Sequence, residues 1–309
     1  MKITLIHNPE SGDDEQVSGD QIVQLIRAAG HKVRYQSSKE KKWKRALKKP
    51  CDIVAVAGGD GIVGKVARRL IGSRTPIAVL PMGTANNIAN TFGLTGKKLK
   101  ELIEGWNDAR CVNFDAGVAK GPWGSRYFIE GFGVGLFAET MFQIENEQHP
   151  GPSHSDDPEE EISAVLKVLK KQLSNYPSKD LTVRLDGQDL SGDYFLLEAL
   201  NVRYIGPNLD LVPRAEINDG LLDVVFVSKD EQTKLSQYIS DRLRHKHSRA
   251  SLTIRRGRHL QIEWDSSPVH IDDRPWPEDE DGRPVLSNAI DIKTDPGALV
   301  FLTPRRARG

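Results

Sequence analysis

The feature that most constrains the fold of this chain is a buried strand that ends in a glycine turn and continues as an amphipathic helix. Residues 53–57 (IVAVA) are all apolar, residues 58–61 read Gly-Gly-Asp-Gly, and apolar residues then recur every three to four positions. Such a turn presents bare backbone N–H groups at a helix N-terminus, where the partial positive charge favours a phosphate. Asp60 adds a carboxylate that can face a nucleotide-bound metal ion. The stretch predicts a phosphate-binding turn.

Two familiar phosphate motifs nearly fit these residues. Gly59-x-Gly61-x-x-Gly64 matches the dinucleotide fingerprint, but the next strand lacks the acidic residue that would hold a ribose. Residues 59–65 match G-x-x-x-x-G-K, but Val66 follows where a Ser or Thr would hold magnesium. We therefore discount both motifs. A tight turn whose glycines serve packing only is the simplest alternative.

Two further strands end in loops of similar composition. The apolar segment 76–82 leads into Gly-Thr-Ala-Asn-Asn at 83–87, and segment 2–7 leads into Asn-Pro-Glu-Ser-Gly at 8–12. In an open parallel sheet, ligands bind outside the carboxyl ends of the strands. Three such loops favour a binding site over a packing role.

At this point the chain resembles a known family. Residues 8–12, 58–61 and 81–86 resemble the three nucleotide motifs of the diacylglycerol kinase catalytic domain family, to which bacterial lipid kinases and sphingosine kinases belong. Residues 131–138 resemble its glycine-rich segment, and residues 218–224 resemble its Asp-Gly-x-Leu-Asp motif. The five segments occur in family order over nearly the whole chain. The resemblance implies a kinase that uses ATP and Mg²⁺.

The pattern along the chain predicts two domains. Strands and helices alternate up to about residue 112, which is typical of a doubly wound parallel α/β sheet. Short strands and turns follow, so we expect a nucleotide-binding domain at 1–112 and a β-sandwich-like lipid-substrate domain at 113–295. The resemblance implies an active site in the cleft between them, with residues 296–309 packing back on the first domain. The polar segment 145–161 predicts a mobile loop.

The resemblance also assigns roles to individual residues. Asp219, with the backbone at Glu216 and Leu221, would hold a magnesium ion. Asp272, with Asp273 as a substitute, would take the proton of the acceptor hydroxyl, and Asp60 would join the catalytic groups. The implied nucleotide-binding residues are Asn8, Gly58, Gly59, Asp60, Gly61, Ile62, Lys65, Gly83 and Thr84.

Four positions depart from the family pattern. Ile62 stands where the family usually has Thr, Lys65 where it has Glu, and Asn87 where it usually has Asp. Arg274 replaces the Glu that closes the late Asp-Gly-Glu motif. Because an arginine cannot accept a proton, Asp272 is the best remaining base.

The amino-acid composition limits which partners and which cellular location we expect. Lys plus Arg equals Asp plus Glu at 43 each, so the net charge gives no sign of a nucleic-acid partner. Two cysteines, no signal peptide and no apolar stretch of about 20 residues predict a cytoplasmic protein that visits the inner membrane surface peripherally. The basic segments 39–49 and 242–259 could lie on an anionic bilayer, but we favour solvated surfaces. No oligomeric state is predicted.

The sequence thus predicts an ATP-dependent lipid kinase that transfers the γ-phosphoryl group to a lipid alcohol. One alternative is a nucleotide-binding relative that has lost catalysis and acts as a sensor or partner protein, which Ile62, Lys65 and Arg274 favour. Another is a soluble kinase of similar fold that acts on a dinucleotide, as NAD kinases do. The Asp-Gly-x-Leu-Asp segment argues against this second alternative. The lipid itself is not identified.

Overall fold

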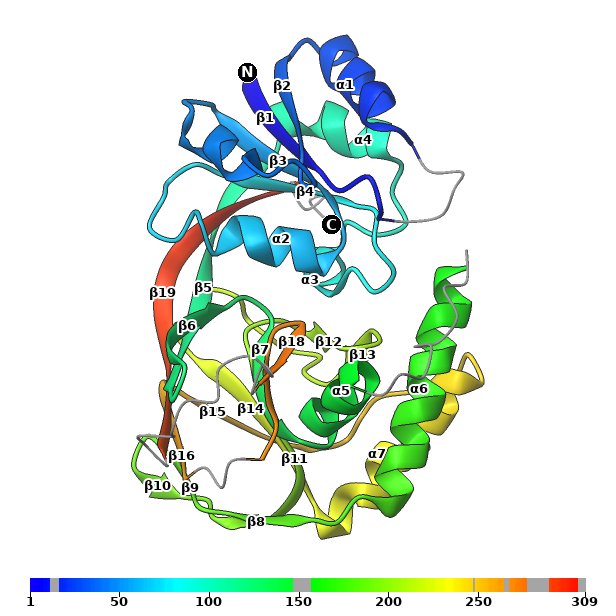
Figure 1. Ribbon diagram of the computed structural model, residues 1–309, viewed down its shortest axis with the longest axis vertical. Helices are drawn as coiled ribbons and strands as arrows, with labels where there is room; N and C mark the ends of the chain where they lie inside the picture. The colour runs from blue at the N-terminus through cyan, green and yellow to red at the C-terminus, as the bar shows by residue number, and fades with distance from the viewer. Residues whose placement is uncertain (12–16, 147–156, 247, 264–266, 277–288, 305–309) are drawn as a thin grey trace. The chain divides into compact units, whose positions relative to one another are not determined.

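A computed structural model describes residues 1–11, 17–146, 157–246, 248–263, 267–276 and 289–304 (Figure 1). The chain divides into two compact units. Unit 1 comprises Met1–Phe114, Asp156–Pro158 and Gly297–Gly309, and unit 2 comprises Asp115–Ser155 and Glu159–Pro296. Two long strands, β5 (Arg110–Gly121) and β19 (Ala289–Thr303), have residues in both units.

Unit 1 is built on a parallel sheet with the order β2-β1-β3-β4. The strands are β1 (Lys2–His7), β2 (Lys32–Ser37), β3 (Ile53–Gly58) and β4 (Ile77–Pro81), and Phe301 of β19 pairs with the start of β4. Every residue of β3 is buried, as expected for the central strand of a sheet covered on both faces. The predicted doubly wound α/β domain is confirmed.

The helices of unit 1 follow the predicted order, with some different bounds. They are α1 (Gly19–Ala28), η1 (Trp43–Lys48), α2 (Asp60–Ala67), α3 (Asn87–Thr91), α4 (Leu99–Glu104) and η2 (Gly105–Asn107). A capping box at Ser18 starts α1, since its side chain accepts the backbone N–H of Gln21 and the Gln21 side chain accepts that of Ser18. Within segment 39–49, residues Trp43–Lys48 form a short 3₁₀ helix, and α2 ends at Ala67.

Unit 2 contains a seven-stranded sheet with the order β15-β14-β11-β7-β17-β18, and β8 also pairs with β11. Strands β10, β9, β16 and the first part of β19 pair in that order, within the sheet that continues through β19 to β4, and β5 pairs with β6. The bounds are β6 (Gly124–Phe128), β7 (Gly131–Gly135), β8 (Lys179–Leu181), β9 (Val183–Leu185), β10 (Gln188–Asp189), β11 (Gly192–Leu200), β12 (Tyr204–Ile205), β13 (Leu209–Asp210), β14 (Leu222–Ser228), β15 (Thr253–Gly257), β16 (His259–Glu263), β17 (Val269–Ile271) and β18 (Arg274–Trp276).

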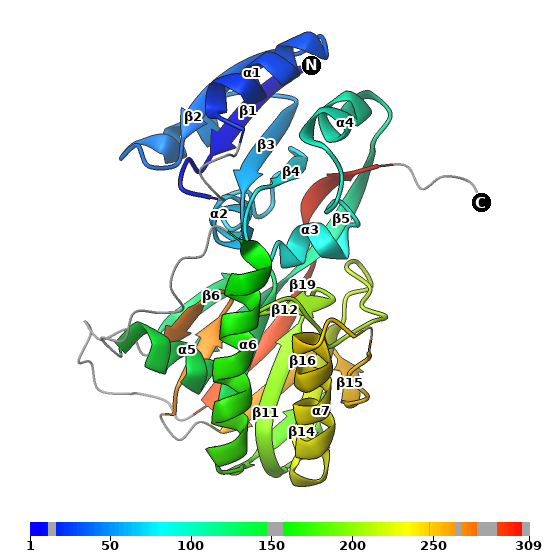
Figure 2. The ribbon, with the colours of Figure 1, turned by 90° about the vertical axis from the view of Figure 1, so that its right-hand side faces the viewer.

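Alternation along the strands of unit 2 serves two cores. One face of β11 and β14, including Leu197 and Val224, packs against residues of β9, β16 and β19 to form the sandwich core. The opposite face, including Leu196 and Val225, packs against helices. These helices are α5 (Leu136–Asn146), α6 (Pro158–Asn175) and α7 (Gln232–Leu243), and η3 (Lys229–Glu231) precedes α7. Figures 1 and 2 show α6 and α7 side by side.

The β-sandwich-like second domain is therefore confirmed. The predicted loop at 145–161 is only partly correct, because α5 extends to Asn146 and α6 starts at Pro158. Residues 147–156 lie outside the described part of the chain.

Candidate functional site

The three glycine- and asparagine-containing loops of unit 1 meet at the carboxyl ends of β1, β3 and β4. A Cβ atom on Gly58 would lie 2.5 Å from Ile62 Cγ2 and 3.2 Å from the Ser11 hydroxyl, and one on Gly59 would lie 3.1 Å from Gly83 Cα. Only glycines permit so close an approach of three loops. Since the chain runs from β1 to β2 on one side and returns to β3 on the other, the loops also lie at the point where the strand order reverses.

The carboxylate of Asp60 already has two hydrogen-bond donors. Its oxygens accept the backbone N–H of Asn87 at 2.7 Å and that of Ile88 at 3.0 Å, which caps the N-terminus of α3 from the neighbouring helix. Asn86, which precedes α3, has a left-handed backbone and supplies no side-chain cap of its own. Asp60 therefore ties the second loop to the third.

The other predicted nucleotide-binding residues differ in exposure. Ile62 is buried and packs against Gly58. An apolar side chain therefore occupies the position where the family usually has the hydroxyl of a Thr. Lys65 is exposed on α2. Asn8 donates its side-chain amide to the Ser11 hydroxyl at 2.6 Å, and Thr84 is half-buried.

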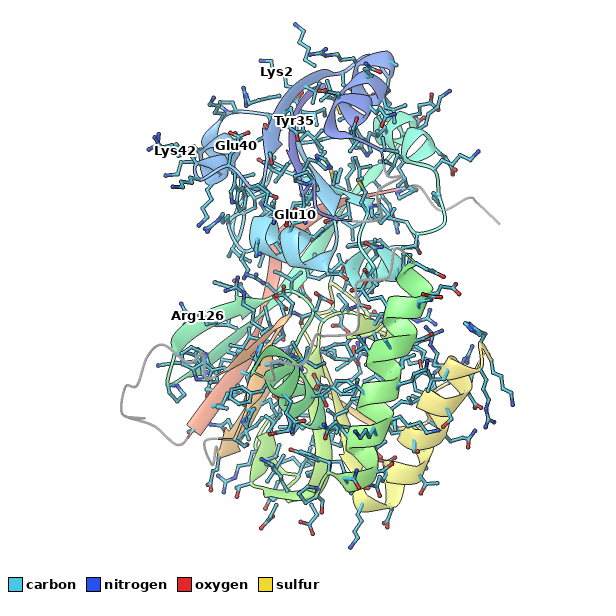
Figure 3. All side chains as sticks on the ribbon, turned by 45° about the vertical axis from the view of Figure 1, so that its right-hand side comes forward. Lys2, Glu10, Tyr35, Glu40, Lys42 and Arg126 are labelled. Atoms are coloured by element: carbon cyan, nitrogen blue, oxygen red, sulfur yellow. The ribbon has the colours of Figure 1, made fainter. Side chains whose placement is uncertain are left out.

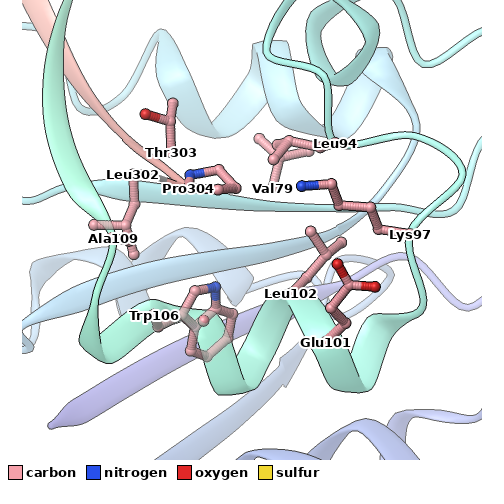
Figure 4. A pocket seen from close by; sticks show the side chains of 11 residues that line it. Val79, Leu94, Lys97, Glu101, Leu102, Trp106, Ala109, Leu302, Thr303 and Pro304 are labelled. Carbon is pink, nitrogen blue, oxygen red and sulfur yellow. The ribbon is translucent and has the colours of Figure 1, made fainter. Parts of the chain in front are cut away.

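Unit 1 also contains a pocket of about 180 Å³ at α4 and the end of β19 (Figure 4). Figure 4 shows Trp106, Leu102 and Leu302 around it, with Lys97 and Glu101 at one side. None of the predicted nucleotide-binding residues lines this pocket. It therefore adds nothing to the three-loop site.

In unit 2, Asp272 starts the two-residue turn between β17 and β18. Its backbone is left-handed, with φ of 55°, and its carboxylate oxygen Oδ1 accepts the backbone N–H of Ile129 at 2.9 Å and that of Glu130 at 2.8 Å. Its own N–H donates to the carbonyl of Gly131 at 2.8 Å. Asp273, the second residue of the turn, is exposed whereas Asp272 is buried.

Behind this turn, His270 and Glu198 form a buried pair. The imidazole Nε2 lies 2.9 Å from Glu198 Oε2, and the side chains are 1% and 0% exposed. His270 Nδ1 lies 3.0 Å from the Asp272 carbonyl. Glu198 and His270 flank Gly133 on the two neighbouring strands, and a Cβ on Gly133 would collide with both side chains.

Burial and mutual charge set the protonation of this pair. Burial raises the pKa of the Glu198 carboxyl, and the neighbouring imidazole opposes that shift only in part. Burial alone would lower the pKa of His270, but the charge and hydrogen bond of Glu198 outweigh it, so the pKa is raised. As a pair, Glu198 and His270 therefore hold a proton more strongly than the same two groups would in water.

The carboxylate of Asp219, the one side chain among the predicted magnesium ligands, already has protein donors. Asp219 Oδ1 accepts the backbone N–H of Leu221 at 2.9 Å, and Oδ2 pairs with the guanidinium of Arg256. A metal ion at Oδ2 would meet the like charge of Arg256. Within the described residues, no group of three or more His, Cys, Asp or Glu side chains is placed to hold a metal ion. The residues as arranged do not fit the magnesium ion predicted at Glu216, Asp219 and Leu221.

Asp115 and Asp223 complete the surroundings of this turn. Asp115 accepts the backbone N–H of Gly220 at 2.6 Å, and Arg256 Nε lies 3.2 Å from Asp223 Oδ1. Burial and then the nearby charge of Glu216 raise the pKa of Asp223 to about 6. Asp115 thus accepts a backbone donor of the turn, and Asp223 pairs with the arginine of the adjoining strand.

The basic segment 39–49 turns its charges outward. Trp43 and Ala46 are buried, and Arg69 lies over the Trp43 ring at 5.7 Å. Figure 3 shows Glu40 and Lys42 pointing away from unit 1. The tryptophan serves the core of unit 1 and is not presented to a bilayer.

Sequence reasoning missed Glu198, His270 and Arg256. Glu198 is the single charge in the apolar run 195–200 (FLLEAL), which was the available signal for a buried partner. Arg256 lay within a segment that was interpreted only as basic surface. Its role depends on the pairing of β15 with β14, which places it opposite Asp223.

Comparison with known proteins covers both units. Residues 2–119 match the diacylglycerol kinase catalytic domain, and residues 159–303 match the YegS C-terminal NAD kinase beta sandwich-like domain. A diacylglycerol kinase of Mycobacterium tuberculosis (strain ATCC 25618 / H37Rv) is 26% identical over 98% of this chain and 96% of its own length. A Cronobacter sakazakii protein named "Probable lipid kinase YegS-like" is 28% identical over 74% of each chain.

A solved structure from Bacillus anthracis str. Sterne has the same fold. It superimposes with a TM-score of 0.71 at 20% identity, and the match covers 98% of this chain and 96% of that chain. This similarity establishes the fold.

Proposed function

This chain belongs to the diacylglycerol kinase catalytic domain family, and we propose that it is an ATP-dependent lipid kinase. It transfers the γ-phosphoryl group of ATP to the hydroxyl of a lipid alcohol. Because the relatives over most or all of the chain are named diacylglycerol kinase, diacylglycerol is the first acceptor to test. Residues 1–112 serve as the nucleotide-binding domain, and residues 113–295 serve as the lipid-substrate domain.

The observation that carries the proposal is the meeting of the three loops at the strand-order reversal of unit 1. Gly58, Gly59 and Gly83 approach one another where no side chain could fit, while Asn8 and Thr84 supply polar groups beside them. A helix N-terminus follows directly, and its N–H groups favour a phosphate. The arrangement suits a triphosphate better than an apolar ligand.

Asp272 takes the proton of the acceptor hydroxyl as the oxygen attacks the γ-phosphorus, and ADP leaves. Three backbone N–H groups hold its Oδ1, and His270 Nδ1 lies against its carbonyl, so the carboxylate is positioned before substrate binds. Asp60 holds the third loop to the second and so shapes the phosphate cradle. A magnesium ion, when bound with ATP, would supply positive charge that offsets the negative charge of the phosphates.

The lipid acceptor implies contact with a membrane surface. Among the described residues, no helix combines the length and apolarity that crossing a bilayer requires. We propose, from the lipid acceptor, that the protein acts peripherally at the cytoplasmic face of the membrane.

A sensor that binds nucleotide without catalysis is the second candidate. Two residues support it. Ile62 is apolar and buried beside the three loops, and Arg274, two residues after Asp272, replaces a carboxylate of the family motif. Both changes remove groups that the family uses for transfer, while the cradle itself is retained.

Transfer of radiolabel from γ-labelled ATP decides between these candidates. The acceptors are vesicles that contain diacylglycerol, monoacylglycerol or sphingosine, and NAD in solution serves as a further acceptor. Label in the lipid extract supports the lipid kinase, whereas label in NAD supports a dinucleotide kinase. ATP binding without transfer to any acceptor supports the sensor.

A further inference from the structure

We propose that Arg256 is a built-in cation that holds the Asp219 turn in place of a magnesium ion. The inference concerns the fold of unit 2 and goes beyond the proposed kinase activity. Its starting point is the disagreement between the family resemblance, which implies a metal at Asp219, and the contacts of that carboxylate.

Strand pairing brings Arg256 to this position. Strands β14 and β15 are antiparallel, and their register places Arg256 directly opposite Asp223. The guanidinium then spans two carboxylates: Nε lies 3.2 Å from Asp223 Oδ1, and Nη2 pairs with Asp219 Oδ2. A planar guanidinium presents donors in a fixed fork, so one side chain can serve both acceptors.

The burial of the two acceptors explains why a cation is needed there. The Asp223 side chain is 6% exposed and that of Asp219 is 17% exposed, so neither charge is well solvated. Asp219 lies in the turn that precedes β14, whereas Asp223 lies within β14. Arg256 thus ties the turn to the sheet and supplies positive charge beside Asp219, where the resemblance implies a magnesium ion.

Backbone N–H groups of the protein provide the other hydrogen bonds around the Asp219 turn. Leu221 N–H donates to Asp219 Oδ1, and Gly220 N–H donates to Asp115 Oδ2. The turn is closed by backbone and arginine donors. We therefore expect its stability to be independent of divalent cations.

Thermal unfolding of the full chain, without nucleotide, tests this inference. At matched ionic strength, the Tm of the wild type should be the same in EDTA and in excess magnesium. Arg256→Gln should lower the Tm by about 2–6 °C, because it leaves two partly buried carboxylates unpaired. Arg255→Gln is the matched control on the same strand, since Arg255 is exposed and is opposite Val224, and it should change the Tm far less.

A double-mutant cycle tests the pairing itself. Asp219→Asn keeps an oxygen for the Leu221 N–H but removes the charge. The double variant with Arg256→Gln should lose less stability than the sum of the two single losses, because each single substitution already breaks the same Asp219–Arg256 contact. A rise in the wild-type Tm on adding magnesium, equal losses for Arg255→Gln and Arg256→Gln, or strictly additive losses in the cycle would each overturn the proposal. None of these readouts depends on kinase activity.

Discussion

The imidazole of His270 lies 2.9 Å from the carboxylate of Glu198, and the two side chains meet across a residue that has no side chain, Gly133. This relationship explains one glycine of the segment 131–138 by packing rather than by ligand binding. It also connects the interior of unit 2 to the Asp272 turn, because His270 Nδ1 lies within hydrogen-bond distance of the Asp272 carbonyl.

Stability should fall as pH rises above about 6.5, the ordinary pKa of histidine. The pKa of His270 is raised in the folded protein, so its stabilisation is fully present below the unfolded pKa and is lost as pH rises through the folded one. The raised pKa of Glu198 acts in the same direction. Glu198→Gln should flatten the decline of Tm with pH in this range.

The exposed pair of His259 and Asp291 provides the control for this pH profile. Its atoms are 2.6 Å apart, but both side chains are about one-third exposed, so solvent screens their interaction. Asp291→Asn should leave the slope nearly unchanged. Parallel profiles for the wild type and Glu198→Gln would contradict the account of the buried pair.

Gly133→Ala should destabilise the chain by about 1–3 kcal/mol, because its Cβ forces apart a buried pair that has no room to move. Chemical denaturation with a fluorescence readout measures the loss. Gly105→Ala is the control, since the structure shows open space around it and an ordinary φ of −70°. Equal stability of the two variants would refute the packing role of Gly133.

Gly61→Val should abolish ATP binding while the chain stays folded. Gly61 lies in the first turn of α2 beside the three loops, where a β-branched side chain would obstruct a phosphate. Calorimetric titration with ATP checks this, with Gly105→Val as the matched substitution far from the loops in sequence. Unchanged affinity in folded Gly61→Val would place the nucleotide elsewhere.

The two-domain architecture could be predicted because its signals are local. The apolar runs of β3 and β14 and the Asp-Gly turn at 186–187 each specify their own segment. The Glu198–His270 and Asp219–Arg256 contacts could not be predicted in the same way. Each joins residues far apart in sequence, so it depends on a strand register that only the folded sheet supplies.

The role of Asp60 shows the same limit. Its place in the glycine turn predicts a phosphate-facing carboxylate, yet two N–H groups of α3 point at it. Those donors come from the next loop, and the sequence of the turn alone carries no sign of them.

Arg274→Glu should raise phosphoryl transfer, because it restores the carboxylate that closes the Asp-Gly-Glu motif of the family, two residues after Asp272. Initial rates with saturating ATP measure the effect. Lys65→Glu also restores a family residue, but Lys65 is exposed, so it should change the rate little. A fall in rate for Arg274→Glu would show that the arginine contributes to transfer.

The most direct test of the central claim is the rate of radiolabel transfer from γ-labelled ATP to diacylglycerol in vesicles, measured for the wild type and Asp272→Asn. Asparagine keeps an oxygen for the Ile129 and Glu130 N–H groups, so the fold and ATP affinity should persist. Loss of the base should lower turnover about 100- to 10,000-fold. The exposed neighbour Asp273→Asn should retain nearly full activity. Equal turnover of Asp272→Asn and the wild type would contradict the assignment of the base, and transfer by neither protein to any lipid tested would contradict the lipid kinase itself.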